Sequence, residues 1–135
     1  MNQITIPINE LKPALAGLSK VVGKRMTLPV LAALRIDRDQ DGWITITGTD
    51  LDSFACVRLE QPDSGAPTTL VIGLAELRQL AKSCAANEKI TLCAMGNERV
   101  TLRYPIGNQT AEKQVPCFPP EALQDSDLKP LWASL

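Results

Sequence analysis

The sequence contains no histidine, and this absence excludes several kinds of chemistry. Histidine is the usual general base at neutral pH, so a Ser-His-Asp or Cys-His triad is excluded, and a zinc site is disfavoured. The four cysteines stand at irregular spacings without a CxxC pair. Because no export signal precedes them, we predict reduced thiols that mostly lie in the core. We expect no metal and no cofactor.

Aromatic residues, glycine-rich motifs and long apolar runs are also scarce. Aromatic residues make up 4% of the chain and are not interleaved with basic residues, so a platform that stacks on bases is not expected, and Trp43 and Phe54 are predicted in the core. No GxGxxG or GxxxxGK motif is present to bind a phosphate group. No apolar run approaches the roughly 20 residues of a membrane span, and the N-terminus lacks the pattern of a signal peptide. What remains is the composition of one ordinary globular domain.

The net charge of −1 conceals an uneven distribution. Residues 9–25 contain four cations and one acid, which gives +3, so the rest of the chain must sum to −4. A local basic patch on a slightly acidic chain indicates directed contact with a polyanion, while a solvated helix face would account for it equally well. The cations are Lys12, Lys20, Lys24 and Arg25, and the acid is Glu10.

The first half of the chain predicts a strand, a helix and three strands. Residues 3–8 alternate between apolar and polar and predict the first strand. From Asn9 to Val22 apolar residues recur with helical spacing, and this predicts an amphipathic helix with Asn9 as N-cap and Gly23 as its stop. Three extended runs follow, and the turn sequence DQDG separates the first two. They cover residues 28–37, 43–48 and 53–60.

The second half repeats this order. A strand is predicted over residues 68–72, a helix over 73–85, and three strands over 88–95, 96–104 and 108–115. One side of the predicted helix is apolar, and the exposed side carries cations. The repeat predicts an α+β fold in which both helices pack on one side of antiparallel sheets. The apolar side holds Leu74, Leu77, Ala81, Cys84 and Ala85, and the exposed side holds Arg78, Gln79 and Lys82 beside Glu76.

Several segments resemble the N-terminal domain of the bacterial DNA polymerase III beta subunit, the DNA sliding clamp. They are LKPAL, TLPVLAALRI, DGWITITGTDLDSFACVRL and VPCFP. The pair TLPVL and TGTDLD is the most specific part of the resemblance, and the predicted strand–helix repeat agrees with it. The resemblance implies the DNA clamp fold, two strand–helix–three-strand repeats, over residues 1–119.

Clamps of this family carry three such domains per chain and close head to tail as dimers around duplex DNA. The resemblance therefore implies a cytoplasmic, non-catalytic processivity factor that tethers the replicative polymerase to its template. Duplex DNA would be bound weakly and without sequence preference, because an encircling protein needs only a few phosphate contacts. The polymerase and the clamp loader would bind other domains of the parent protein, and self-association into a ring is expected of the full-length protein.

The resemblance also implies that both helices face DNA. Arg25 beside TLP matches a basic residue that reaches DNA in the family, and Lys82 matches a basic position on the second helix. For each cation, the alternative is a solubilising side chain. The predicted DNA-binding residues are Lys12, Lys20, Lys24, Arg25, Arg78 and Lys82.

Asp50 and Asp52 join two alternating runs in the segment GTDLD. In a turn between antiparallel strands, Asp and Thr side chains accept hydrogen bonds from backbone amides, and the matching TGTDL stretch in the family is a structural hairpin. A cation with oxygen ligands takes six or more of them, and Asp37, Asp39 and Asp41 lie at the opposite end of the neighbouring strand. We therefore predict a turn here rather than a metal site.

Two features depart from the family. In a first domain, the strand that corresponds to residues 108–115 closes the ring with apolar side chains. Here either Thr110, Glu112 and Gln114 or Ala111 and Lys113 would face the neighbouring subunit, and a charged edge discourages strand pairing. The groove for partner peptides lies between the second and third domains of the family, so this chain is expected to lack it.

Residues 120–135 predict a linker and then the opening of another helix, with apolar residues at Leu128, Leu131, Trp132 and Leu135. We therefore expect the chain to be the first domain of a longer clamp-like protein, and the alternative is a free-standing domain.

Two other functions remain open from the sequence. A clamp-like module that binds a partner protein without encircling DNA predicts no salt-dependent affinity for DNA. A carboxylate–metal enzyme that uses Asp50 and Asp52 predicts Mg²⁺ or Mn²⁺ binding that is lost in Asp50→Asn.

Overall fold

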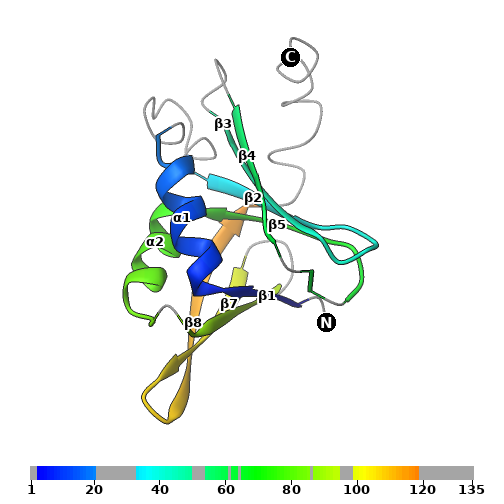
Figure 1. The fold of residues 1–135 in the computed structure, drawn as a ribbon. Helices are drawn as coiled ribbons and strands as arrows, with labels where there is room; N and C mark the ends of the chain where they lie inside the picture. The colour runs from blue at the N-terminus through cyan, green and yellow to red at the C-terminus, as the bar shows by residue number, and fades with distance from the viewer. Residues whose placement is uncertain are drawn as a thin grey trace.

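The computed structural model describes residues 3–20, 33–49, 54–60, 62–63, 65–85, 87–94 and 99–118. Each half of the chain contributes a strand, a helix and three strands (Figure 1), so the predicted α+β fold and its repeat are confirmed. The first half comprises β1 (Gln3–Pro7), α1 (Ile8–Leu18), β2 (Ala33–Arg38), β3 (Ile44–Thr49) and β4 (Phe54–Arg58). The second half comprises β5 (Thr68–Gly73), α2 (Leu74–Lys82), β6 (Lys89–Ala94), β7 (Arg99–Ile106) and β8 (Gln109–Phe118).

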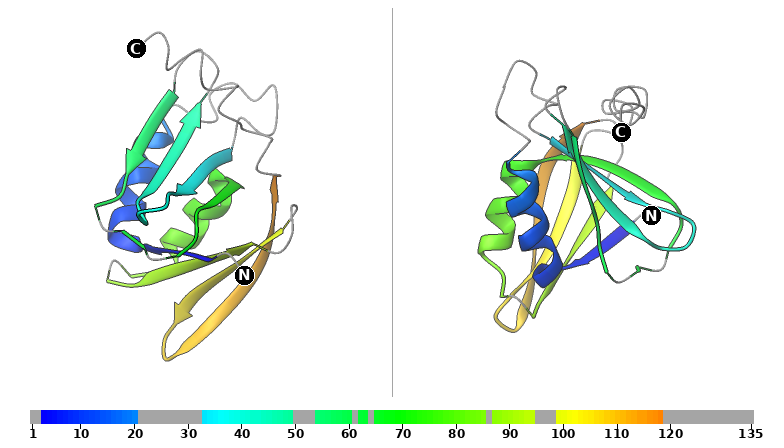
Figure 2. Two further views of the ribbon diagram at one scale, coloured as in Figure 1. Left: turned by 90° about the vertical axis from the view of Figure 1, so that its right-hand side faces the viewer. Right: turned by 45° about the horizontal axis from the view of Figure 1, so that its top comes forward.

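All strand pairs are antiparallel, and the strands follow the order β1-β6-β7-β8-β5-β2-β3-β4. The first strand of each half pairs with the other half, because β1 pairs with β6 and β5 pairs with β2. The two repeats are therefore interlocked, because β1 joins the strands of the second half and β2 joins β5. Figure 2 shows the sheet curving around one side of the molecule while both helices lie side by side against it.

The core lies between the helices and the inward face of the sheet. In β1, β2 and β3, buried residues alternate with partly exposed residues over at least part of each strand. This alternation is expected because successive side chains of a strand point to opposite faces of the sheet. Burial of large aliphatic side chains is the main favourable term in such a domain. The largest fully buried side chains include Ile4, Ile6, Leu11, Leu18, Leu34, Ile46, Ile72, Leu77 and Ile90.

The N-terminus of α1 differs from the prediction. The helix begins at Ile8 rather than after Asn9, and its N-cap position is Pro7, which makes no side-chain capping bond. The reason is tertiary: the backbone N–H of Ile8 donates to the carbonyl oxygen of Glu88 at 2.9 Å, so an amide of the first turn is satisfied by the second half of the chain. No Asn9 cap is needed.

Both helices end earlier than predicted, α1 at Leu18 and α2 at Lys82. A serine follows each of them and donates its hydroxyl to a carbonyl of the last turn, Ser19 to Ala16 at 2.9 Å and Ser83 to Leu80 at 2.8 Å. These bonds satisfy carbonyls that a helix terminus leaves free. Beyond α2, Cys84 is buried as predicted but Ala85 is exposed. The predicted stop at Gly23 lies outside the described residues.

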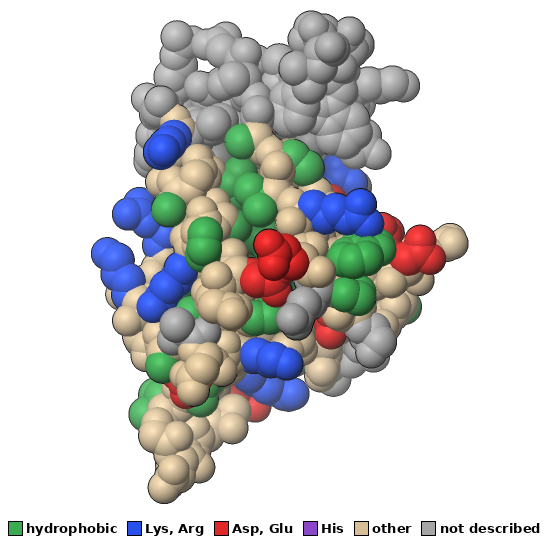
Figure 3. Space-filling model, in the orientation of Figure 1, with side chains coloured by type: hydrophobic (Ala, Val, Ile, Leu, Met, Phe, Trp, Pro, Cys, Tyr) green, Lys and Arg blue, Asp and Glu red, His purple; other side chains and the backbone are tan. Residues whose placement is uncertain are grey.

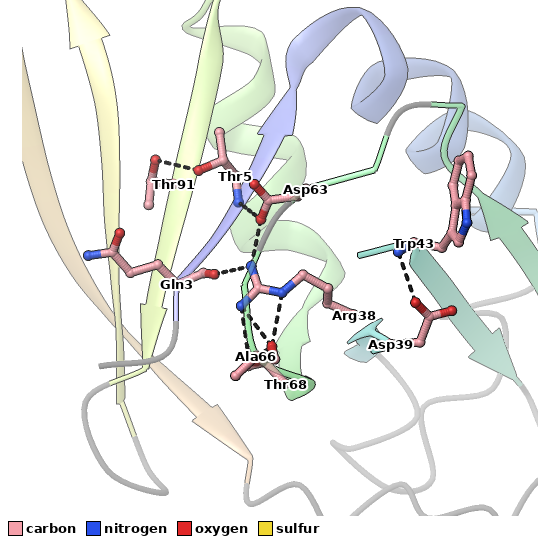
Figure 4. Close-up of polar contacts among 9 residues, drawn as sticks. All are labelled: Gln3, Thr5, Arg38, Asp39, Trp43, Asp63, Ala66, Thr68 and Thr91. Atoms are coloured by element: carbon pink, nitrogen blue, oxygen red, sulfur yellow. Dashed lines mark hydrogen bonds and ion pairs between the residues drawn. The ribbon is translucent and has the colours of Figure 1, made fainter. Parts of the chain in front are cut away.

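A buried arginine joins the two halves at the edge of β1 that faces away from β6, where none of the described strands pairs with it (Figure 4). The Arg38 guanidinium forms an ion pair with Asp63 at 2.6 Å and donates to the carbonyl oxygens of Gln3 and Ala66. The same Asp63 carboxylate accepts the backbone N–H of Thr5 at 3.1 Å. The Arg38 side chain is only 3% exposed, so these partners supply what water would otherwise provide. Nothing in the sequence pattern predicted this cluster.

The turn at residues 39–42 forms as predicted. The Asp39 carboxylate accepts the backbone N–H groups of Asp41 at 2.9 Å and Trp43 at 3.0 Å, and Gly42 has a φ of 90°. The prediction that Trp43 is a core residue is wrong. Trp43 is partly exposed, and the Arg58 guanidinium lies 4.5 Å from its ring centroid. The side chain of Phe54 lies outside the described part of the structure.

Candidate nucleic-acid interface

The two helices bury their apolar sides and turn their cations outward. In α1 the buried residues recur with helical spacing, and Lys12 falls between them on the exposed side. In α2 the same pattern exposes Arg78 and Lys82, four residues apart and therefore on one face. Figure 3 shows Lys and Arg side chains gathered along the left of the molecule, where both helices lie. The buried residues are Ile8, Leu11, Ala14, Leu15 and Leu18 in α1 and Leu74, Leu77, Leu80 and Ala81 in α2.

A groove of about 490 Å³ runs between the helices, and we call it the interhelix groove. Both helices contribute to its walls, and three of its seven lining residues are cationic. Among the described residues, no carboxylate lines it. A concave surface with one sign of charge concentrates the electrostatic field and attracts anions. The lining residues are Lys12, Leu15, Ala16, Ser19, Arg78, Ala81 and Lys82.

Lys12 is fixed in place by the opposite helix. Its Nζ donates to the carbonyl oxygen of Cys84, just beyond the C-terminus of α2, at 3.3 Å. A cation at this end of a helix is favourable because the helix dipole leaves negative potential there. Lys12 therefore crosses from α1 to α2 at one end of the interhelix groove.

The structure brings together three of the six predicted DNA-binding residues. Lys12, Arg78 and Lys82 share the interhelix groove. Lys20 is exposed in the turn that follows α1, and it does not line the groove. Lys24 and Arg25 lie outside the described residues, so their predicted role stays a prediction.

An acidic recess of about 180 Å³ lies at the N-terminal end of α1. One Glu10 carboxylate oxygen accepts the backbone N–H of Glu60 at 2.5 Å, and Glu88 accepts that of Ala85 at 2.6 Å. The sequence offered Glu10 only as a charge opposing the basic patch, and no local signal linked it to the distant Glu60 or Glu88. The recess is lined by Pro7, Asn9, Glu10, Glu60, Asn87, Glu88 and Lys89.

Carboxylates in the described part of the chain form no group of three or more potential ligands that could hold a metal ion. Asp37 forms an ion pair with Arg35 at 2.9 Å and accepts the Thr69 hydroxyl at 2.7 Å. Asp39 accepts the backbone amides of its own turn. Asp50 and Asp52 lie outside the described residues, so the choice between a turn and a metal site stays a prediction.

The four cysteines all lie among the described residues, and none of them forms a disulfide bond there. Cys84 and Cys93 are buried as predicted and Cys117 is partly buried, but Cys56 is exposed on β4, which corrects the expectation for that residue. Burial raises the pKa of the Cys84 thiol because the thiolate would lose its hydration. Among the described helices, none has the length and apolar character needed to cross a membrane.

Comparison with known proteins identifies the family. A family model for the N-terminal domain of the DNA polymerase III beta subunit matches residues 2–121. The chain matches none of the curated proteins. The solved structure of the DNA polymerase III subunit beta from Pseudomonas aeruginosa is 20% identical, with a TM-score of 0.76, over 91% of this chain and 31% of that chain.

Two further solved structures agree. The DNA polymerase sliding clamp from Caulobacter crescentus is 19% identical with a TM-score of 0.73, over 88% of this chain and 31% of that chain. The DNA polymerase III beta subunit from Thermotoga maritima is 20% identical with a TM-score of 0.68, over 87% of this chain and 30% of that chain. The chain thus spans about a third of the length of these proteins. On the family match over residues 2–121, the chain belongs to the family of the DNA polymerase III beta subunit N-terminal domain.

Proposed function

We propose that this chain is a domain of a DNA sliding clamp, a non-catalytic factor that keeps a DNA polymerase on its template. In this role α1 and α2 face duplex DNA, and the sheet forms the outer wall of a ring. The observation that carries the proposal is the cationic face of the two helices, where Lys12, Lys20, Arg78 and Lys82 are all exposed. The family match supports it.

Weak binding suits this role. A protein that encircles DNA needs no tight complex, and cations that contact phosphates give sequence-independent affinity that falls with salt. Such contacts allow sliding because every backbone position offers the same phosphate. The chain as a whole has a net charge of −1, so attraction to DNA must come from this local face rather than from the bulk of the molecule.

The ring is proposed at the level of a longer protein. Residues 1–119 would form the first domain, and residues 120–135 would lead into the next. The chain spans 30–31% of the length of the solved clamps that it matches, which is consistent with one domain of three. The polymerase and the clamp loader would bind the other domains.

A salt titration tests the proposal. Anisotropy of a fluorescent duplex should report weak binding that decreases as KCl rises from about 20 to 200 mM. Lys20→Glu combined with Arg25→Glu should weaken this binding further by placing acids on the proposed DNA face. The matched control is Arg58→Glu with Arg99→Glu, which changes the net charge equally at exposed strand positions. An equal loss of DNA affinity in both double variants, or no loss in the Lys20 and Arg25 double variant, would refute the assignment of the DNA face.

The solution mass tests the assembly. Light scattering over a range of concentrations should give a monomer near the 14.6 kDa of the chain if the ring resides in a longer protein. A stable assembly of six copies would instead mean that a single domain closes a ring by itself.

A second candidate is an interaction module that never encircles DNA, and the edge of β8 favours it. Over most of its length β8 pairs only with β7, and its contact with β5 is limited to Cys117 and Phe118. From Gln109 to Gln114 the exposed residues of β8 are polar or charged, including Thr110, Glu112 and Gln114. A charged edge resists pairing with a second strand. This candidate predicts no salt-dependent affinity for duplex DNA and no effect of the helix-face substitutions.

A further inference from the structure

We propose that the interhelix groove is a single phosphate seat, in which Lys12, Arg78 and Lys82 together hold one phosphate of the DNA backbone. This inference rests on the proposed function and sharpens it, since it replaces a diffuse cationic face by one defined point of attachment. Lys20, outside the groove, would contact a different phosphate.

The first argument is geometric. The three cations come from two helices but line one concave surface. Arg78 and Lys82 stand one turn apart on α2, and Lys12 reaches across from α1 to the carbonyl oxygen of Cys84. That hydrogen bond uses one of the three donors of the ammonium group, so two remain for an anion. A cation already held in place loses less conformational entropy when the anion arrives.

The second argument is the charge balance. The groove carries three cations, and none of its seven lining residues is acidic. Like charges on neighbouring helix positions repel one another, and one bound anion relieves that repulsion for all three cations at once. Buried Leu15 and Ala81 form part of its lining, and an apolar lining limits the screening of these charges.

The third argument concerns which anion fits. In the described part of the chain no aromatic residue lines the groove, so these residues offer no surface on which a base could stack. The Ser19 hydroxyl donates its proton to Ala16, so the donors that remain are ammonium and guanidinium groups. An arginine fork together with two lysines provides donors that match the oxygens of a phosphodiester. An acidic peptide would satisfy the same charge, so the experiment below separates the two.

The experiment measures the affinity of each variant for duplex DNA at several salt concentrations. It then compares the slopes of log affinity against log salt concentration between variants. Each phosphate contact contributes about 0.9 to this slope for duplex DNA. If the three cations share one phosphate, Arg78→Gln with Lys82→Gln should lower the slope by about 0.9, and each single change should account for most of that loss. If they contact separate phosphates, the double change should lower it by about 1.8.

Two further variants complete the design. Adding Lys12→Gln to the double variant should lower the slope little further. Because Lys12 also holds the end of α2, an NMR spectrum of the backbone amides verifies that each variant is folded. Lys20→Gln is the matched control outside the groove. The decrease in slope that it causes should add fully to the decrease caused by the groove variants. The Arg78 and Lys82 pair leaves the Lys12 hydrogen bond in place, so the test stands even if Lys12→Gln unfolds the chain.

The outcomes separate this inference from the proposed function. The seat is supported if the decreases in slope caused by the Arg78 and Lys82 changes do not add to one another, while the decrease caused by Lys20→Gln adds to them. Duplex binding with fully additive losses, or with no loss at the groove, overturns the seat and leaves the proposed function standing. Absence of duplex binding at every salt concentration, together with groove-dependent binding of a polyglutamate peptide, overturns both.

Discussion

The two halves of the molecule follow the same order of elements but complete their sheets differently. In the second half, the last strand β8 reaches the first strand β5 through backbone pairing of Phe118 with Val71 and Cys117 with Ile72. In the first half, β4 is the last of the described strands in the sheet order and does not pair with β1. The amide of Thr5 on β1 is instead bound by the Asp63 carboxylate, which Arg38 holds in place.

The difference shows that a strand edge can be satisfied by a side-chain cluster as well as by another strand. A strand ladder uses groups that every residue carries, so it tolerates many sequences. The Arg38 cluster uses one guanidinium and one carboxylate, so it depends on two particular residues and on the space around them. The first half is therefore expected to be the more sensitive to single substitutions.

The largest expected effect comes from removing Arg38. In Arg38→Met, Asp63 loses its partner and the carbonyl oxygens of Gln3 and Ala66 lose their donor, so the free energy of unfolding should fall by about 3 kcal/mol. Urea unfolding followed by circular dichroism measures it. The control is Arg103→Met, whose ion pair with Glu112 is 40% and 58% exposed and should contribute at most about 0.5 kcal/mol. Similar decreases in the free energy of unfolding in both variants would contradict the expectation that the first half is the more sensitive to single substitutions.

A smaller effect is expected at the two turn glycines. Gly42 has a φ of 90°, and an added Cβ would lie 2.7 Å from the carbonyl oxygen of Asp63. Gly42→Ala should therefore cost about 2 kcal/mol through both strain and overlap. Gly107, at the β7–β8 turn, has a φ of 58° and open space around it, so Gly107→Ala should cost only about 1 kcal/mol.

Thermal unfolding of both glycine variants provides the measurement. If Gly107→Ala proved the more destabilising, the first half would not be the more tightly constrained one.

The smallest effect concerns thiol reactivity. Cys56 is exposed on β4 in the first half, whereas Cys84 is buried in the second half and the pKa of its thiol is raised. A raised pKa means less thiolate at a given pH, and the thiolate is the nucleophile. Iodoacetamide at about pH 8 should therefore modify Cys56 first and Cys84 slowly, as peptide mass spectrometry would show.

Unfolding in urea should remove the difference between the two thiols. Equal rates in the folded chain would mean that Cys84 is accessible.

Much of the site was predictable because it depends on local periodicity. The helical spacing of apolar residues placed Lys12, Arg78 and Lys82 on exposed helix faces, and the structure has them there. The meeting of Lys12 with Cys84, and hence the groove itself, was not predictable, because it depends on how two helices distant in the chain pack together. The same reason explains why Glu10, Glu60 and Glu88 were not grouped in advance.

By itself, the sequence determined the element types, their repeated order and which face of each helix is apolar, because these follow from the spacing of residues along the chain. The tertiary structure alone decided where α1 begins and how the repeats interlock. The amide of Ile8 is bound by Glu88, and the edge of β1 is completed by Arg38 and Asp63. These bonds join residues far apart in the chain, and only the folded backbone brings buried donors and acceptors within reach of each other.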